Sequence, residues 1–176
     1  MPATTLHESS FGVLEKITSV LIVILKKAAE SPEAASLPAA RLYADMHPLT
    51  YQVQIISRMV KMLFEKLADA AEPELAELTD PTIADLIARA EKLLALVKTI
   101  SPDAVNGKED EPVVMATPNS GTWNMTRKTL ASNFIVPNSF FHLQTVYSIL
   151  RMNGVPLGKA DFLLSFAGPP AVFPQK

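Results

Sequence analysis

The feature that most constrains the fold is a stripe of apolar residues at helical spacing, repeated in four separate segments of the chain. The clearest stripe follows the pair Asp80-Pro81, in which aspartate predicts a helix N-cap and proline predicts the first helical residue. Ser101-Pro102 predicts the end of this helix, because the residue before a proline disfavours the helical conformation. The stripe consists of Ile83, Leu86, Ile87, Ala90, Leu93, Leu94 and Val97.

The other three segments have the same period. We expect these helices to span Ser10–Glu30, Leu49–Ala70 and Arg127–Asn153. Four amphipathic helices with long connections predict a single all-α domain over residues 1–176, folded as a four-helix bundle.

The last of these helices has sequence signals for its start, its end and a kink. Thr126 is its expected N-cap, and Gly154 is its expected C-terminal stop. Pro137 lies inside the segment and lacks a backbone N–H, so we expect it to kink the helix or to split it in two.

The first helix contains the uncharged run Ile17–Leu25. A membrane-spanning helix needs about 20 apolar residues, so this run predicts a buried core helix and no membrane partner. Residues Met1–Ser10 contain no lysine or arginine, which argues against a signal peptide. The additional apolar residues Val20, Ile22 and Val23 predict that more than one side of the helix is covered.

The segments between the helices are long. Residues 31–48 have no regular period, and connections of this length are often functional. Within Asp103–Thr126, the turn signal Pro118–Gly121 separates two short apolar runs, which predicts a small β-hairpin. We expect a mobile N-terminus at about residues 1–8 and a proline-rich C-terminal tail at about residues 166–176.

The charge balance excludes one class of partner. The formal net charge is −2, so nothing in the composition favours nucleic acid. The chain has no cysteine, which excludes thiolate metal sites and fits a reducing compartment such as the cytoplasm.

The strongest candidate site lies on the last helix. Asn138 and His142 are four residues apart and therefore share one helix face, just after Pro137. A histidine with an ordinary pKa is suited to be a general acid or base. The alternative is a hydrogen-bonded polar pair inside the core.

A second candidate lies just before the second helix, where Asp45 and His47 form an Asp-x-His pair. This pair is suited to hold a proton or a metal, and its alternative is a cluster that stabilises the positive end of the helix. His7 is the third histidine, and the sequence contains no His-x-x-x-His. The side chains expected to shape a substrate pocket are Tyr43, Tyr51, Gln52, Trp123, Asn138, Tyr147 and Arg151.

Two segments of the sequence resemble a known family. They are Ala40–Val60, which reads ARLYADMHPLTYQVQIISRMV, and Phe134–Leu163, which reads FIVPNSFFHLQTVYSILRMNGVPLGKADFL. Both are similar to the uncharacterised family numbered nineteen ninety-three in the domain-of-unknown-function series. That family in turn looks like a branch of the DinB-like four-helix bundles.

The resemblance implies a metal-binding ancestry. DinB-like proteins hold a metal with three histidines, one on the second helix and an His-x-x-x-His on the fourth, and several are thiol-dependent transferases or isomerases. Here the pair on the fourth helix matches Asn138 and His142, and the position on the second helix falls near Gln52 or Gln54. If a divalent metal such as Zn or Ni binds, we expect its ligands to be His142, His47 and Asn138.

Three functions follow as expectations. The first is a small-molecule enzyme without a cofactor, an isomerase, cyclase or dehydratase acting on an apolar or aromatic metabolite, with His142, His47 and Asp45 as its catalytic residues. The second is a metal-dependent transferase or isomerase of the DinB-like kind. The third is a non-catalytic ligand-binding or structural module, in which the apolar surplus on the first helix serves a homodimer.

Overall fold

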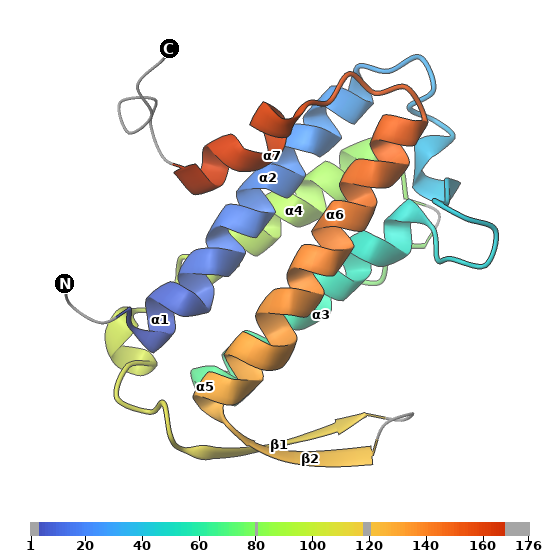
Figure 1. Ribbon diagram of the computed structural model, residues 1–176. Helices are drawn as coiled ribbons and strands as arrows, with labels where there is room; N and C mark the ends of the chain where they lie inside the picture. The colour runs from blue at the N-terminus through green and yellow to red at the C-terminus, as the bar shows by residue number, and fades with distance from the viewer. Residues whose placement is uncertain (1–3, 80, 118–120, 168–176) are drawn as a thin grey trace.

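Four long helices lie side by side around a common apolar core (Figure 1). The computed structural model describes residues 4–79, 81–117 and 121–167. The helices of the bundle are α2 (Phe11–Ala29), α3 (Leu49–Leu67), α4 (Ile83–Val97) and α6 (Val136–Met152). Helix α2 contacts α4 and α6, and α3 also contacts α4 and α6, so the four helices close into a ring. The expected four-helix bundle is confirmed.

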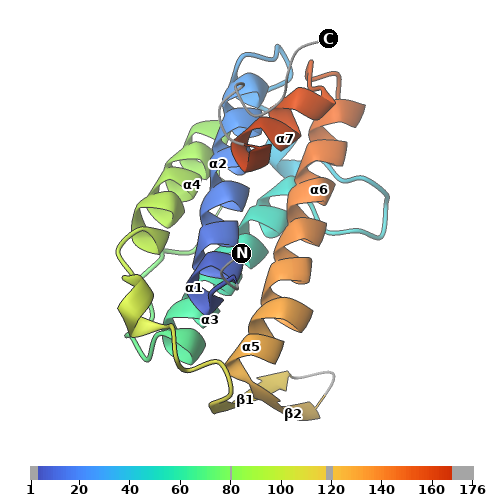
Figure 2. The same cartoon turned by 60° about the vertical axis from the view of Figure 1, so that its left-hand side comes forward.

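The connection between α3 and α4 runs back along both helices, and we call its described residues, 68–79, 81 and 82, the strap. Three side chains hold it: Gln54 donates to the carbonyl of Leu78, Arg89 to that of Ala76 and Lys92 to that of Glu74. Residue numbers rise along the strap as they fall along α3 and α4. The strap is therefore antiparallel to both helices, and α3 and α4 run in the same direction (Figures 1 and 2).

Helix α2 is covered on several sides, as its apolar surplus predicted. It contacts α7 (Lys159–Ala167) in addition to α4 and α6, and only Val23 among its large apolar side chains stays exposed. The surface that the sequence offered for a homodimer is thus largely occupied within the chain. No helix in the described part of the chain is long and apolar enough to cross a membrane.

The segment expected to be a mobile N-terminus, about residues 1–8, contains the start of a short helix. This helix, α1 (Leu6–Ser9), begins with a capping box between Thr5 and Glu8. Leu6 is buried in the core, and the backbone N–H of His7 donates to the side chain of Asn106. Residues 1–3 lie outside the described part of the chain.

Helix α4 begins two residues later than the sequence predicted. The expected N-cap Asp80 lies outside the described residues, and the N-cap in the structure is Thr82. The Thr82 hydroxyl accepts from the backbone N–H of Asp85, and the Asp85 carboxylate accepts from the backbone N–H of Thr82. This reciprocal box satisfies two backbone donors at once, which explains why the helix begins here.

The last long helix is split, as Pro137 predicted, but its path stays continuous (Figure 1). Thr126 caps α5 (Arg127–Leu130), and a π-helical turn, Ala131–Ile135, separates α5 from α6. Proline cannot donate to the preceding turn, and a wider turn accommodates that missing hydrogen bond. Gly154 ends α6 with φ at 83°.

The predicted hairpin is confirmed at the α5 end of the bundle (Figure 1). Its strands are β1 (Pro112–Thr117) and β2 (Gly121–Thr126), paired antiparallel with Met115 opposite Trp123. The expected turn includes residues 118–120, which lie outside the described part of the chain. Of the expected proline-rich tail, the structure describes only residues 166 and 167, which end α7.

Candidate functional site

The candidate site lies where α3 and α6 pack against each other in opposite directions. One contact joins Gln52 on α3 to His142 on α6, and another joins Met59 to Asn138. Both α6 residues project from one face because they are four residues apart. The α3 residues that meet them are seven apart, which is two helical turns on the same face.

A short hydrogen bond fixes the ring of His142. The distance between His142 Nδ1 and Gln52 Oε1 is 2.6 Å, and Gln52 is only 3% exposed. The amide of Gln52 is oriented by its own donor, since Nε2 donates to the carbonyl of His47 at 2.9 Å. Because the oxygen of Gln52 only accepts, Nδ1 of His142 must carry the proton. The lone pair of the neutral ring is therefore on Nε2.

Aromatic rings surround this histidine. The His47 and Tyr51 rings are stacked with centroids 3.8 Å apart, and the Tyr51 ring meets His142 edge-on at 6.5 Å. The ring of Phe141 makes a T-shaped contact with the ring of His142, with 5.2 Å between the centroids. The imidazole thus lies in a largely apolar setting that favours its neutral form.

The electrostatic setting keeps His142 uncharged at neutral pH. Burial, and secondarily the nearby charge of His47, lowers the pKa of His142 from 6.5 to about 4. At pH 7 the side chain is therefore a neutral acceptor at Nε2 and a donor at Nδ1. Asn138, one turn earlier, donates from Nδ2 to the sulfur of Met59 at 3.3 Å.

The other residues expected at the site lie elsewhere. Tyr43 is 71% exposed, and Asp45 is also exposed in the loop before α3. Trp123 is on β2, where its ring meets Phe134 edge-on. Arg151, at the C-terminal end of α6, donates to the carbonyl of Val155. Tyr147 of α6 packs against Phe162 of α7. The structure thus brings together His47, Tyr51, Gln52, Asn138 and His142 only.

The family described as a domain of unknown function, DUF1993, matches residues 6–163. The chain belongs to the DUF1993 family. Among solved structures, it is similar to a DinB family member protein from Shewanella denitrificans, with 27% sequence identity and a TM-score of 0.77. That match covers 90% of this chain and 92% of the other, and no curated protein matches.

The donor set at this site does not match the three-histidine site that the resemblance to DinB-like proteins implied. Two side-chain amides lie at or near the positions where the resemblance implied histidines, and both are hydrogen-bonded. Gln52 bonds to His142 and His47, and Asn138 bonds to Met59. In the described part of the chain, no group of three His, Cys, Asp or Glu side chains is placed to hold a metal. The strong ligand atoms that remain at the site are Nε2 of His142 and the ring nitrogens of His47.

Hollows on the described surface of this DUF1993 protein include four that His142 does not line. One of these four, of about 510 Å³, is lined by Tyr51, whose ring also contacts His142 edge-on. Tyr51 is therefore shared by this hollow and the surroundings of His142.

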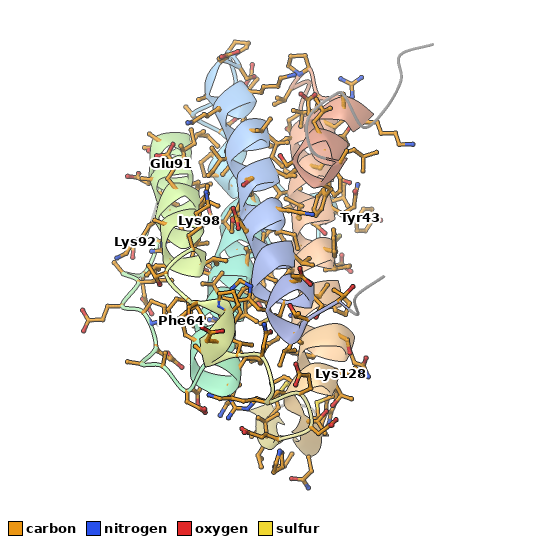
Figure 3. The ribbon with its side chains drawn as sticks, turned by 90° about the vertical axis from the view of Figure 1, so that its left-hand side faces the viewer. Tyr43, Phe64, Glu91, Lys92, Lys98 and Lys128 are labelled. Carbon is orange, nitrogen blue, oxygen red and sulfur yellow. The ribbon has the colours of Figure 1, made fainter. Side chains whose placement is uncertain are left out.

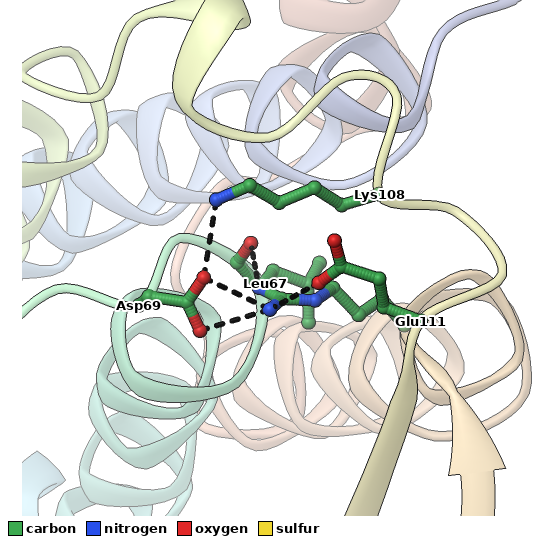
Figure 4. A network of polar contacts seen from close by, with 5 residues as sticks. Leu67, Asp69, Lys108 and Glu111 are labelled. Atoms are coloured by element: carbon green, nitrogen blue, oxygen red, sulfur yellow. Dashed lines mark hydrogen bonds and ion pairs between the residues drawn. The ribbon is translucent and has the colours of Figure 1, made fainter.

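Two buried arginines were missed in the sequence. Arg127, 6% exposed, donates to the carbonyl of Leu67 and pairs with Asp69 and Glu111 (Figure 4). Arg89, 9% exposed, donates to the strap. A signal existed for Arg89, which interrupts the apolar face of its helix next to Ala90 and Leu86. Nothing in the sequence marked Arg127, because its partners come from distant segments.

Proposed function

We propose that this DUF1993 protein is a small-molecule enzyme that moves a proton without a cofactor, with Nε2 of His142 as the proton acceptor. The observation that carries the proposal is the bond from His142 Nδ1 to Gln52, which fixes one tautomer and leaves Nε2 as the acceptor. Isomerisation, cyclisation and dehydration all need a group that takes a proton at one atom and returns it at another.

The low pKa of His142 limits the class of substrate from which it could remove a proton. A base with a pKa of about 4 is unprotonated at neutral pH but weak, so the hydrogen it removes must be acidic. A C–H flanked by two carbonyl groups meets this condition. The anion that forms would also raise the pKa of the adjacent imidazole, because an opposite charge favours the protonated ring. The aromatic surroundings favour an apolar or aromatic body for such a substrate.

Three neighbouring residues receive positioning roles in this proposal. Gln52 holds the tautomer of His142, and the stacked pair of His47 and Tyr51 forms one wall of the site. His47 is exposed and is the second group suited to exchange a proton with solvent. The cysteine-free chain suits a reducing cytoplasm, where we place this activity.

The proposal is tested with benzoylacetone, an aromatic 1,3-dicarbonyl compound whose central C–H exchanges with D₂O. NMR measures the exchange rate with wild-type protein, with His142→Ala and with a control, His7→Gln, which changes a histidine that bonds to the carbonyl of Ile100. We expect wild type and the control to accelerate exchange, and His142→Ala to lose roughly 10²-fold or more of that acceleration. Equal acceleration by His142→Ala, with its circular dichroism unchanged, would remove His142 from the chemistry.

The second candidate is a metal-dependent transferase or isomerase of the DinB kind. One observation favours it: an imidazole with Nδ1 bonded to an oxygen and Nε2 presented as acceptor is the arrangement of metal-ligating histidines. The incomplete donor set counts against it. Metal analysis of protein purified without a histidine tag, after incubation with Zn²⁺ or Ni²⁺ and gel filtration, decides the question. A stoichiometric metal that His142→Ala fails to retain would favour this candidate over the first.

The third candidate is a non-catalytic homodimer. Large apolar side chains stay exposed on α6 and α7, namely Phe141, Met152, Leu163 and Leu164. Sedimentation velocity of wild type and of Leu164→Asp tests whether this surface joins two copies. A dimer that the substitution dissociates supports this candidate, whereas a monomeric wild type at all concentrations removes it.

A further inference from the structure

The strap encloses two adjoining hollows against the bundle, on a side of α3 different from the one that meets His142. One hollow of about 510 Å³ lies near the start of α3, and the other of about 320 Å³ lies further along the same helix. Gln54 and Leu78 line both hollows, and the Gln54 amide bonds to the Leu78 carbonyl at 3.3 Å. The bonded pair is therefore the boundary that the two hollows share, and we call the two adjoining hollows together the groove under the strap.

The smaller hollow is cationic. Arg58 and Lys61 line it from α3, three residues apart on one helix face, and Arg89 lines it from α4. The acidic groups at this place are Glu77, which also lines the hollow, and Glu72, which lies 3.6 Å from the Lys61 ammonium. Three cations against these two carboxylates leave an excess of positive charge.

Arg89 is the unusual member of this set. It is 9% exposed, and its bond in the described structure is to the backbone carbonyl of Ala76, with no carboxylate paired to it among the described residues. Burial alone lowers the pKa of Arg89, and no acidic neighbour offsets that effect. A buried cation is stable when an anion pairs with it, and a guanidinium has a planar set of donors that fits a carboxylate or a phosphate.

The larger hollow has different chemistry. Three prolines, Pro38, Pro48 and Pro81, line it together with the ring of Tyr51. Prolines and an aromatic ring offer flat apolar surface, and the pocket is large enough for a ring-sized group. A molecule with an acidic head and an apolar body would match both parts of the groove.

We propose that the groove under the strap binds a small organic oxyanion, a carboxylate or phosphate attached to a flat apolar body. The head occupies the cationic hollow at Arg58, Lys61 and Arg89, and the body lies against Tyr51 and the prolines. This site is separate from His142 and does not depend on the proton-transfer proposal.

The test is isothermal titration calorimetry with benzoate, phenyl phosphate and neutral benzamide. The protein variants are the double substitution Arg58→Gln with Lys61→Gln, the conservative Arg89→Lys, His142→Ala, and Lys26→Gln. Lys26 is the charge control, since it pairs with Glu91 of α4 and neither residue lines the two hollows. Figure 3 labels Glu91 on α4. Arg58 is exposed and Lys61 only half-buried, so the double variant is expected to fold.

We expect benzoate or phenyl phosphate to bind saturably and benzamide to bind at least roughly tenfold more weakly, because the charge-assisted bonds are lost. The double variant and Arg89→Lys should each weaken the anion by a similar factor, while Lys26→Gln and His142→Ala leave binding unchanged. The tighter of the two anions identifies the head group as carboxylate or phosphate. Equal binding of benzamide, full binding by the double variant, or no saturable binding of either anion would overturn the proposal.

Discussion

At the scale of single residues, the decisive arrangement is the pair His142 and Gln52. The sequence placed His142 on a shared face with Asn138, and periodicity alone was enough for that. It did not predict the hydrogen bond to Gln52, because that bond depends on the packing register of two helices far apart in the chain. The same register determines the neutral state of His142, which an isolated sequence motif does not reveal.

Replacing Gln52 with glutamate should raise the pKa of His142 above its present value of about 4, because a carboxylate next to Nδ1 favours the protonated ring. The measurement is an NMR titration of the imidazole protons. The matched control is Gln54→Glu, which adds the same charge on α3 at the strap, where the residue bonds to Leu78. A titration midpoint for His142 that is unchanged in Gln52→Glu would show that the ring and this side chain are not in contact.

The depressed pKa of His142 also has a consequence for stability. The unfolded chain binds a proton near pH 6.5 and the folded chain only near pH 4, so between these values the unfolded state holds more protons. The free energy of unfolding should therefore fall as the pH decreases from 6.5 to 4, by about 1–2 kcal/mol from this group after solvent screening of its exposed part. Urea unfolding at several pH values measures the slope. His142→Gln should show a shallower slope over the same range.

At the scale of elements, the sequence predicted most helices. The start of one helix was misplaced, because two residues close together were suited to be its N-cap. Pro137 and Gly154 marked a split and a stop correctly, since both act through their own backbones. Asp80-Pro81 was a plausible start for α4, but Thr82 and Asp85 form a complete capping box two residues later. Helix α7 was not predicted, because its apolar residues do not form a buried stripe at helical spacing. It lies on α2, and its Phe162 packs against Tyr147 of α6.

The end of α3 gives a stability prediction. Arg127 donates to the buried end of that helix at the Leu67 carbonyl, and Asp69, whose φ is 51°, turns the chain beside it (Figure 4). Arg127→Met leaves the carbonyl without this partner and should lower the free energy of unfolding by about 1–3 kcal/mol. Lys108→Met, which removes only an exposed partner of Asp69, should cost less than about 1 kcal/mol. Equal costs in urea unfolding would contradict the capping role.

At the scale of the whole molecule, two segments complete the bundle, the strap in the middle of the chain and α7 near its C-terminal end. The strap lets α3 and α4 run in one direction, and α7 returns over α2. Hydrophobic patterning predicted that a bundle forms, because each helix must bury its stripe. The order in which helices are adjacent, and the groove under the strap, depend on the path of connections that carry no periodic signal.

The contribution of α7 is measurable at this scale. Phe162 lies between Tyr147 of α6 and Phe166 of its own helix, at 5.9 and 6.1 Å between ring centroids. Phe162→Ala should reduce the free energy of unfolding by about 1–3 kcal/mol, below the value for a fully buried phenylalanine because the ring is half-buried. Leu163→Ala, at the exposed neighbouring position, should cost less than about 0.5 kcal/mol. Thermal unfolding that ranks the two in the reverse order would place α7 differently on the bundle.

The π-helical turn Ala131–Ile135 has a consequence for how chains of this kind can vary in length. One residue more or less in a helix rotates everything after it by roughly 100° about the axis. The wide turn holds an extra residue and so sets the phase of α6 against α3. A deletion there would give a more regular helix, yet would turn His142 away from Gln52. The π-helical turn thus determines which face of α6 meets α3. Homologues without it would keep the bundle, but their α6 would present a different face to α3.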